Sequence, residues 1–236
     1  MCVALLVPKF TEVTREKLLN CYVTNPDGFG FSYFNENGQL IIRKFIGQDN
    51  ILIGIEEFLL TREHYMNKQF LAHFRIASHG RISKRTCHPF KINDEMVFCH
   101  NGILSDYSKQ LSLDSKISDT MLFNRKVFQK LPADFMNSPL YKKMLEETIG
   151  TWNKMIIIRA DGQHWILNEE QGEWNDGVWY SNDSYKDYDY SYCGSDYNIE
   201  EVHTPLYKRA YTWCKKLMSI IPDVYEYCKA LMEETE

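Results

Sequence analysis

Two pairs of apolar segments, each separated by a tight turn, constrain the fold of this chain more than any other feature. The turn Asn35-Glu36-Asn37-Gly38 separates residues 29–34 from 40–45, and Asp161-Gly162 separates 154–159 from 164–167. Asn-Gly and Asp-Gly favour the tight turns that join antiparallel strands. Both pairs are therefore predicted to form β-hairpins.

Helical patterns lie between these hairpins. Helices are expected over residues 11–20 and 50–60 and after the N-cap candidate Ser118, and further strands over 2–7, 70–74, 96–99 and 179–181. Hairpins interleaved with helices, without repeated strand-helix-strand units, are typical of an α+β fold with antiparallel sheet. We predict a main domain over residues 2–181, a polar Tyr- and Asp-rich linker or loop over 182–203, and a C-terminal helical extension over 204–236.

Composition narrows the class of partner. The net charge is −5, and no cluster of Lys or Arg forms a stripe for nucleic acid. No apolar run is long enough to span a membrane, and the amino terminus lacks a signal-peptide pattern. Seven cysteines without regular spacing indicate reduced thiols. We expect a cytoplasmic protein that binds neither nucleic acid nor membrane.

Cys2 is the strongest nucleophile candidate. Met1 precedes a small side chain, so its removal would leave Cys2 at the amino terminus. A thiol titrates near pH ~8.5 and an α-amine near ~7.7 to 8.0, so close to neutrality the amine can accept the thiol proton. One residue would then supply both nucleophile and base.

Four ordered motifs follow a cysteine in this position: Arg75 to Gly80, His88-Pro89, His100-Asn101-Gly102-Ile103 and Ser118-Asp119-Thr120. In this order they closely resemble the glutaminase domain of class II glutamine amidotransferases, a family of N-terminal nucleophile hydrolases. The resemblance covers roughly residues 2–181. It implies a four-layer αββα sandwich of antiparallel sheets.

The resemblance also assigns roles. Arg75 would bind the α-carboxylate of glutamine, because a guanidinium matches a carboxylate with two hydrogen bonds. Asp119 would bind the α-ammonium group, although an acidic residue in the first turn of a helix also stabilises the helix dipole. Asn101 and Gly102 would form the oxyanion hole, although an Asn-Gly pair alone is typical of a turn.

Four further positions match the family's pattern. Ser78 and His79 resemble a Thr-His pair that lines the glutamine pocket, and His88 resembles a scaffold histidine of that pocket. Gly28 lies in a loop that the resemblance places beside the nucleophile. Two departures leave the substrate less defined than the mechanism: Ile76 stands where many relatives have Trp, and an arginine that several relatives carry in the loop occupied here by residues 25–28 is absent.

Three alternatives stay open at the level of sequence. A metal site could use His73, His79, His88 and His100, but their spacing does not match a zinc module. An amidase acting on a γ-glutamyl or other small-molecule amide could use the same nucleophile, since Arg75 and Asp119 would recognise only the amino-acid end. A binding protein could retain the fold without activity.

The sequence favours a glutaminase that hydrolyses the side-chain amide of glutamine through a Cys2 thioester, releasing glutamate and ammonia. No metal or organic cofactor is expected. Only about 55 residues follow Ser181, fewer than the ~100 usual for a domain, and no Gly-rich phosphate loop is present. We therefore expect a separate synthase or synthetase to accept the ammonia, or hydrolysis without an acceptor.

Overall fold

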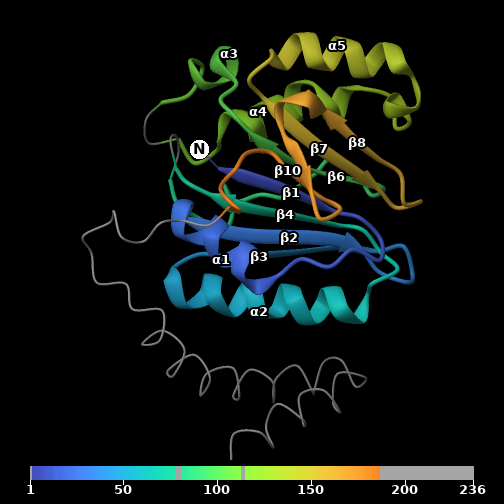
Figure 1. The fold of residues 1–236 in the computed structure, drawn as a ribbon. Helices are drawn as coiled ribbons and strands as arrows, with labels where there is room; N and C mark the ends of the chain where they lie inside the picture. Colours follow the sequence, from blue (N-terminus) through green and yellow to red (C-terminus); the bar gives the residue numbers. More distant parts are fainter. Residues whose placement is uncertain (1, 78–80, 113–114, 187–236) are drawn as a thin grey trace, which may run out of the picture. The chain divides into compact units, whose positions relative to one another are not determined.

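The computed structural model describes residues 2–77, 81–112 and 115–186, which belong to the first of two compact units of the chain, Met1–Tyr188. Two antiparallel sheets lie face to face, and helices cover the outer face of each sheet (Figure 1). This arrangement confirms the predicted α+β class and the four-layer αββα sandwich. No helix within the described ranges is long and apolar enough to cross a bilayer.

The larger sheet has six strands in the order β3-β2-β4-β1-β10-β9. Their bounds are β1 (Val3–Val7), β2 (Gly28–Phe34), β3 (Leu40–Phe45), β4 (Phe70–Arg75), β9 (Glu173–Asn175) and β10 (Val178–Tyr180). Strand β1 is buried at every position, because both faces of the sheet are covered at its centre. The pairing of Phe34 with Leu40 confirms the first predicted hairpin.

The smaller sheet has four strands in the order β5-β6-β7-β8. They are β5 (Phe90–Lys91), β6 (Met96–Asn101), β7 (Lys154–Arg159) and β8 (His164–Leu167). Ile158 pairs with His164, which confirms the second predicted hairpin. Asn101 is the last residue of β6, so the Asn101-Gly102 pair ends a strand here and does not join a tight hairpin.

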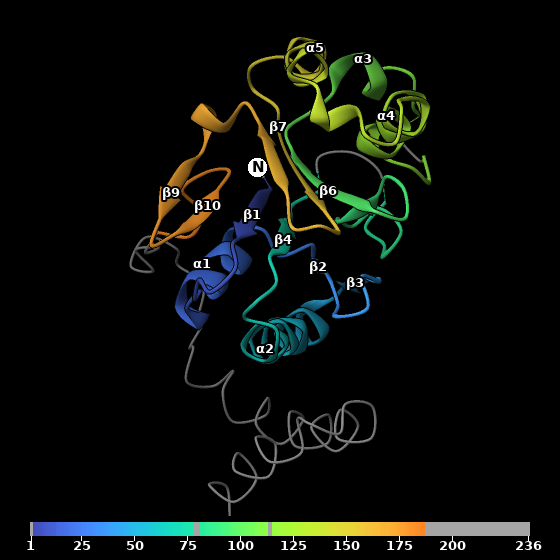
Figure 2. The ribbon, with the colours of Figure 1, turned by 90° about the vertical axis from the view of Figure 1, so that its right-hand side faces the viewer.

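The helices form the two outer layers (Figure 2). Helices α1 (Arg15–Thr24) and α2 (Gln48–His64) lie on the side of the six-stranded sheet, and α3 (Ser105–Ser108), α4 (Asp119–Lys126) and α5 (Pro139–Ile149) lie on the side of the four-stranded sheet. Phe58 of α2 shows why that layer is stable, because its ring meets Phe31 and Phe70 of the sheet edge-on at 5.4 and 5.7 Å between centroids. Three 3₁₀ turns, Phe128–Lys130, Phe135–Asn137 and Glu169–Gln171, complete the described structure.

Helix α1 corrects one predicted boundary. The sequence suggested a helix over 11–20, but α1 begins at Arg15 and ends at Thr24. Thr14 is the N-cap, and its hydroxyl accepts the N–H of Lys17 at 3.3 Å. The hydroxyl of Thr11 is instead directed to the Lys9 carbonyl at 3.4 Å. The helix therefore begins after Thr14 and not at Thr11.

Other elements were not predicted. Helices α3 and α5 and the short strands β5 and β9 lie outside the predicted elements, and α2 extends beyond the predicted 50–60 at both ends. By contrast, Ser118 is the N-cap of α4, as predicted, and its hydroxyl accepts the N–H of Met121 at 3.2 Å. Most of the predicted linker over 182–203 and all of the predicted extension over 204–236 lie outside the described residues.

The space between the two sheets is filled by apolar side chains from both. Along β1, β4 and β6 these include Ala4, Leu6, Leu71, Val97 and Cys99, and β7 and β10 add Ile156, Ile158 and Trp179. Side chains alternate between the faces of a strand, so every second residue of these strands points into this layer. That alternation decides which polar residues meet at its end.

Candidate active site

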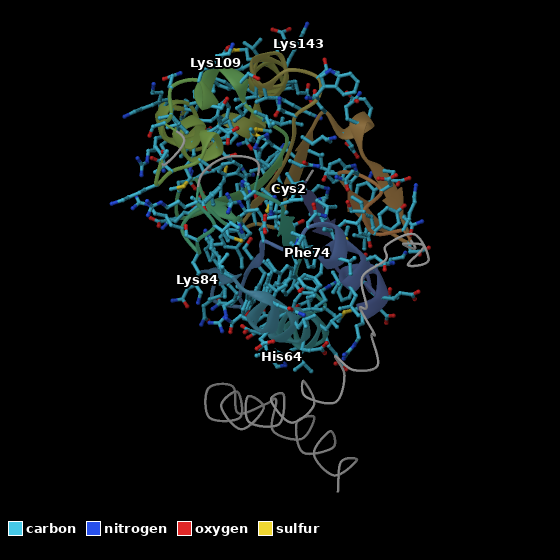
Figure 3. All side chains as sticks on the ribbon, turned by 90° about the vertical axis from the view of Figure 1, so that its left-hand side faces the viewer. Cys2, His64, Phe74, Lys84, Lys109 and Lys143 are labelled. Carbon is cyan, nitrogen blue, oxygen red and sulfur yellow. The ribbon has the colours of Figure 1, made fainter. Side chains whose placement is uncertain are left out.

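Polar residues replace apolar ones at one end of the layer between the sheets. Cys2 precedes Ala4 by two positions, Arg75 follows Leu71 by four, and Asn101 follows Cys99 by two. Each therefore faces the other sheet. The register that pairs Val3 with Phe74 brings Cys2 beside Arg75. Figure 3 shows Cys2 at the level of the two sheets, with Phe74 nearer to α2.

The sulfur of Cys2 lies against the backbone of Ile76. Its Sγ is 3.3 Å from the Ile76 carbonyl and 3.4 Å from the Ile76 N–H, so the thiol can donate to the first and accept from the second. Burial raises the pKa of the Cys2 thiol, while the Ile76 hydrogen bond, the Arg75 guanidinium and the amino-terminal charge each lower it. A nucleophile here depends on a nearby base to take its proton.

Asn101 is connected to the strand that follows Cys2, the candidate nucleophile. Its Nδ2 donates to Ser181 Oγ at 2.8 Å, and the same oxygen accepts the backbone N–H of Ala4 at 2.9 Å. Asn101 is 1% exposed, and its Oδ1 has no hydrogen-bond partner in the part of the chain that the structure describes. Ser181 therefore fixes the side chain of Asn101 relative to the strand that begins next to Cys2.

Gly102 occupies a position that no other residue could take. Its φ is +143°, and a Cβ built there would lie 2.2 Å from Oδ1 of Asn153. Both the backbone angle and the close neighbour exclude a side chain. The absence of a side chain lets the Gly102 backbone pack directly against the Asn153 amide.

Asp119 lies at the first position of α4 and is 8% exposed. Its Oδ2 accepts the N–H of Leu104 at 2.8 Å, and its Oδ1 accepts the N–H of Thr120 at 2.8 Å. The carboxylate thus anchors the loop that follows Gly102. Carboxylate oxygens have lone pairs beyond these two bonds, so Asp119 could still bind an ammonium group.

Arg75 is buried, and its Nη1 donates to the Arg81 carbonyl at 3.3 Å. The neighbouring loop is tied to it by Asp27, whose N–H donates to the Arg75 carbonyl at 2.9 Å and whose Oδ2 accepts the Ala77 N–H at 2.7 Å. Asp27 therefore lies beside Ile76, the residue that contacts Cys2. Gly28, expected in a loop, is instead the first residue of β2 and pairs with Arg75. Ser78 and His79, the other two predicted pocket residues, lie outside the described residues.

His88 packs in the interior. Its ring centroid is 4.1 Å from that of His73 and 4.5 Å from that of Phe90. Neither of its ring nitrogens has a hydrogen-bond partner among the residues described, and burial lowers its pKa well below the usual value. A Cβ built on Gly30 would lie 2.1 Å from the backbone carbonyl oxygen of His88, so the two backbones pack closely. These contacts favour a packing role for His88.

Of the four histidines in the metal alternative, the structure describes His73, His88 and His100, and His79 lies outside the described residues. In residues 2–77, 81–112 and 115–186, no group of three or more His, Cys, Asp or Glu side chains could hold a metal ion. His73 and His100 instead meet through a hydrogen-bonding contact between the ring Nε2 of His73 and the backbone carbonyl of His100 at 3.1 Å.

Three residues near the candidate site were missed from the sequence. Ser181 holds Asn101, Asn153 packs on Gly102, and Lys154 is opposite Asn101 in the pairing of β6 with β7. Lys154 is 6% exposed, and burial lowers its pKa. Only the position of Ser181 at the end of the predicted strand over 179–181 was a signal, since that strand brings it into the layer between the sheets.

Comparison with known proteins identifies the family. The sequence model described as "Glutamine amidotransferases class-II" matches residues 14–157, more than half of the chain. The chain therefore belongs to the class II glutamine amidotransferases. The matched region contains Arg75, Asn101, Gly102 and Asp119, and it begins after Cys2.

One of the similar solved structures is an amidotransferase. The glutamine phosphoribosylpyrophosphate amidotransferase from B. subtilis, complexed with ADP and GMP, aligns with a TM-score of 0.41 and 15% sequence identity. The alignment covers 76% of this chain and 41% of that chain, so this chain spans less than half of that protein's length. No curated protein matches the sequence.

Proposed function

We propose that this chain is a glutaminase in which Cys2, once its α-amino group is free, attacks the side-chain amide carbon of glutamine. The observation that supports this most directly is the connection of Asn101 to the strand that follows Cys2. Ser181 Oγ accepts from Asn101 Nδ2 at 2.8 Å and from the backbone N–H of Ala4 at 2.9 Å. A nucleophile and an amide donor then share one end of the layer between the sheets. Arg75 lies beside Cys2, and Asp119 anchors the loop after Gly102.

The proposed reaction has two stages. The Cys2 thiol passes its proton to the α-amine, and the thiolate adds to the amide carbon, so that the carbonyl oxygen becomes an oxyanion held by Asn101 Nδ2 and the Gly102 N–H. The C–N bond then breaks, and the amine returns the proton to the leaving nitrogen, which departs as ammonia. Water adds to the thioester, releases glutamate and restores the thiol. Donors to the oxyanion are typically worth about 3 to 4 kcal/mol each in such sites.

The substrate is recognised by charge in this proposal. Arg75 would bind the α-carboxylate and Asp119 the α-ammonium group, with Ser78 and His79 lining the pocket. The same pair of charges would accept a γ-glutamyl amide other than glutamine. Ammonia would pass to an acceptor held by a separate synthase or synthetase, or be released.

The first prediction tests the nucleophile. Intact mass is measured before and after treatment with 6-diazo-5-oxo-norleucine, a glutamine analogue that alkylates the attacking thiol. We expect a mature chain that starts at Cys2 and gains a single adduct, and the adduct should be lost in Cys2→Ala. The control is Cys21→Ala, since Cys21 is a free thiol that is fully buried.

Each outcome has a defined meaning. An adduct retained in Cys2→Ala, or a residue still attached before Cys2 in an active preparation, would contradict the proposal. A processed chain that releases p-nitroaniline from a γ-glutamyl anilide but no ammonia from glutamine would instead identify an amidase with another γ-glutamyl substrate.

A further inference from the structure

A series of buried hydrogen bonds connects the surroundings of Gly102 with the start of helix α4. His100 Nε2 lies 2.9 Å from Asn153 Oδ1, and His100 Nδ1 lies 2.8 Å from Thr120 Oγ1. Asn153 packs against Gly102, and Thr120 follows Asp119 in α4. His100 is 2% exposed, Thr120 2% and Asn153 8%, so all three are buried.

Asn153 determines the direction of these hydrogen bonds. Its Nδ2 donates to the Ile149 carbonyl at 2.6 Å, which leaves Oδ1 facing His100. An amide oxygen only accepts, so His100 carries its proton on Nε2. Nδ1 then accepts from the Thr120 hydroxyl, which lies 2.8 Å from Nδ1 and 3.4 Å from Asp119 Oδ1, its other acceptor. Burial lowers the pKa of His100, which keeps the ring in this neutral form near pH 7.

The position of Asn153 is itself well determined. Its backbone carbonyl accepts from Asn168 Nδ2 at 2.7 Å, and the same nitrogen donates to the Gly150 carbonyl at 2.9 Å. These bonds hold Asn153 in place, and its Oδ1 lies 2.2 Å from the position that a Cβ of residue 102 would take. A displacement of this oxygen would let the Gly102 backbone move.

The loop after β6 is thus held at two points. Gly102 rests against Asn153, and the Leu104 N–H donates to Asp119 at 2.8 Å. We propose that Asn153, oriented by His100, is a positioning residue that sets the direction of the Gly102 N–H for the oxyanion. The inference rests on the proposed function. Neither side chain needs to touch the substrate.

Two substitutions of His100 separate this role from a general contribution to stability. The terminal nitrogen of Gln reaches the position of Nε2, so His100→Gln keeps the donor to Asn153, whereas the shorter Asn reaches only the position of Nδ1 and keeps only the contact with Thr120. Each variant loses one buried hydrogen bond, so both are expected to lower the melting temperature to a similar extent.

We expect the two variants to differ in turnover. His100→Asn and Asn153→Ala should lower kcat for glutamine about tenfold to a hundredfold, with KM changed by less than about threefold, because a displaced donor weakens transition-state stabilisation. His100→Gln should keep kcat within about threefold of the unmodified protein, since the Asn153 contact remains. Equal kcat values for the two His100 variants, or an unchanged kcat in a folded Asn153→Ala protein, would overturn the proposal.

A second measurement does not depend on turnover. In protein labelled with ¹⁵N-glycine, the Gly102 amide resonance should shift in His100→Asn and Asn153→Ala and stay in place in His100→Gln. If the unmodified protein hydrolyses no glutamine, the proposed function fails, and this resonance alone decides the positioning role. If Asn153→Ala does not fold, the two His100 variants decide it.

Discussion

At the scale of single residues, the candidate site depends on small polar side chains that hold other residues in place. Ser181 accepts hydrogen bonds from Asn101 and from the Ala4 backbone, and Asn182 donates to the Cys2 carbonyl at 2.8 Å. Two consecutive residues after β10 therefore fix both the strand of Cys2, the proposed nucleophile, and the side chain of Asn101, a proposed oxyanion donor. Neither residue carries a charge or a reactive group.

Ser181→Ala tests this support. Without the hydroxyl, the Asn101 amide and the Ala4 N–H lose their shared acceptor, so kcat for glutamine should fall by about tenfold or more through a misplaced oxyanion donor. Ser184→Ala is the matched control, because Ser184 lies nearby and contacts Asn182 only through its backbone N–H. Steady-state kinetics on both variants provide the measurement. Equal kcat values in the two would show that Ser181 does not position Asn101.

At the scale of elements, helix α4 has a role that α1 lacks. Ser118 and Thr14 are both N-caps whose hydroxyls accept a backbone N–H, from Met121 at 3.2 Å and from Lys17 at 3.3 Å. Only the first turn of α4 contains a candidate substrate ligand, Asp119. A change at the N-terminus of α4 should therefore alter substrate binding, and a change at the N-terminus of α1 should not.

Ser118→Ala and Thr14→Ala make this comparison. Loss of a cap typically lowers the free energy of unfolding by ~1 kcal/mol, so denaturant unfolding should show similar losses in both variants. KM for glutamine should rise several-fold in Ser118→Ala alone, because Asp119 would be held less firmly. A KM that rises equally in both variants would mean that the cap acts only through global stability.

Helix α5 illustrates why some elements were not predicted. Its buried face consists of Leu145 and Ile149, while Leu140 and Met144 are 65% and 46% exposed. The apolar residues of α5 recur at three- and four-residue spacing, so a helical signal was present and the prediction overlooked it. The hairpins were predicted well because alternation and turn residues are local signals.

At the scale of the whole molecule, three buried histidines link stability to pH. Burial lowers the pKa of His73 to about 3, and burial also lowers the pKa of His88 and of His100. In the unfolded chain they titrate near ~6.5. Below that pH the unfolded state binds protons that the folded state excludes, so the free energy of unfolding falls as the pH falls.

The pH dependence can be assigned to a single residue. Each excluded proton costs about 1.4 kcal/mol per pH unit below the unfolded pKa, so stability should fall between pH 6.5 and 5. His88→Phe keeps the ring contacts with His73 and Phe90 and removes one titrating group. Its free energy of unfolding should therefore fall less over this range, by about 1.4 kcal/mol per pH unit. His64→Phe, at an exposed position, is the control. Chemical denaturation at several pH values gives the slope of the free energy of unfolding against pH. If His88 does not contribute, this slope will be the same in His88→Phe as in the unmodified protein.

The sequence by itself determined the two hairpins, the antiparallel α+β class, the Ser118 cap and the types of residue able to perform amide chemistry. Turns, periodicity and side-chain chemistry are local properties that can be read within a few residues. Candidate residues such as Arg75, Asn101 and Asp119 were found because their order along the chain matches a family pattern. That order alone does not show how they are held.

The tertiary structure alone decided which residues support them. Ser181 bonds to a residue 80 positions away, and Asn153 to one 53 positions away. Such contacts depend on the stacking of two sheets, which no local pattern encodes, and an isolated Ser or Asn in the sequence is indistinguishable from a surface residue. The protonated nitrogen of His100 and the requirement for glycine at 102 likewise follow only from the neighbours that the fold supplies.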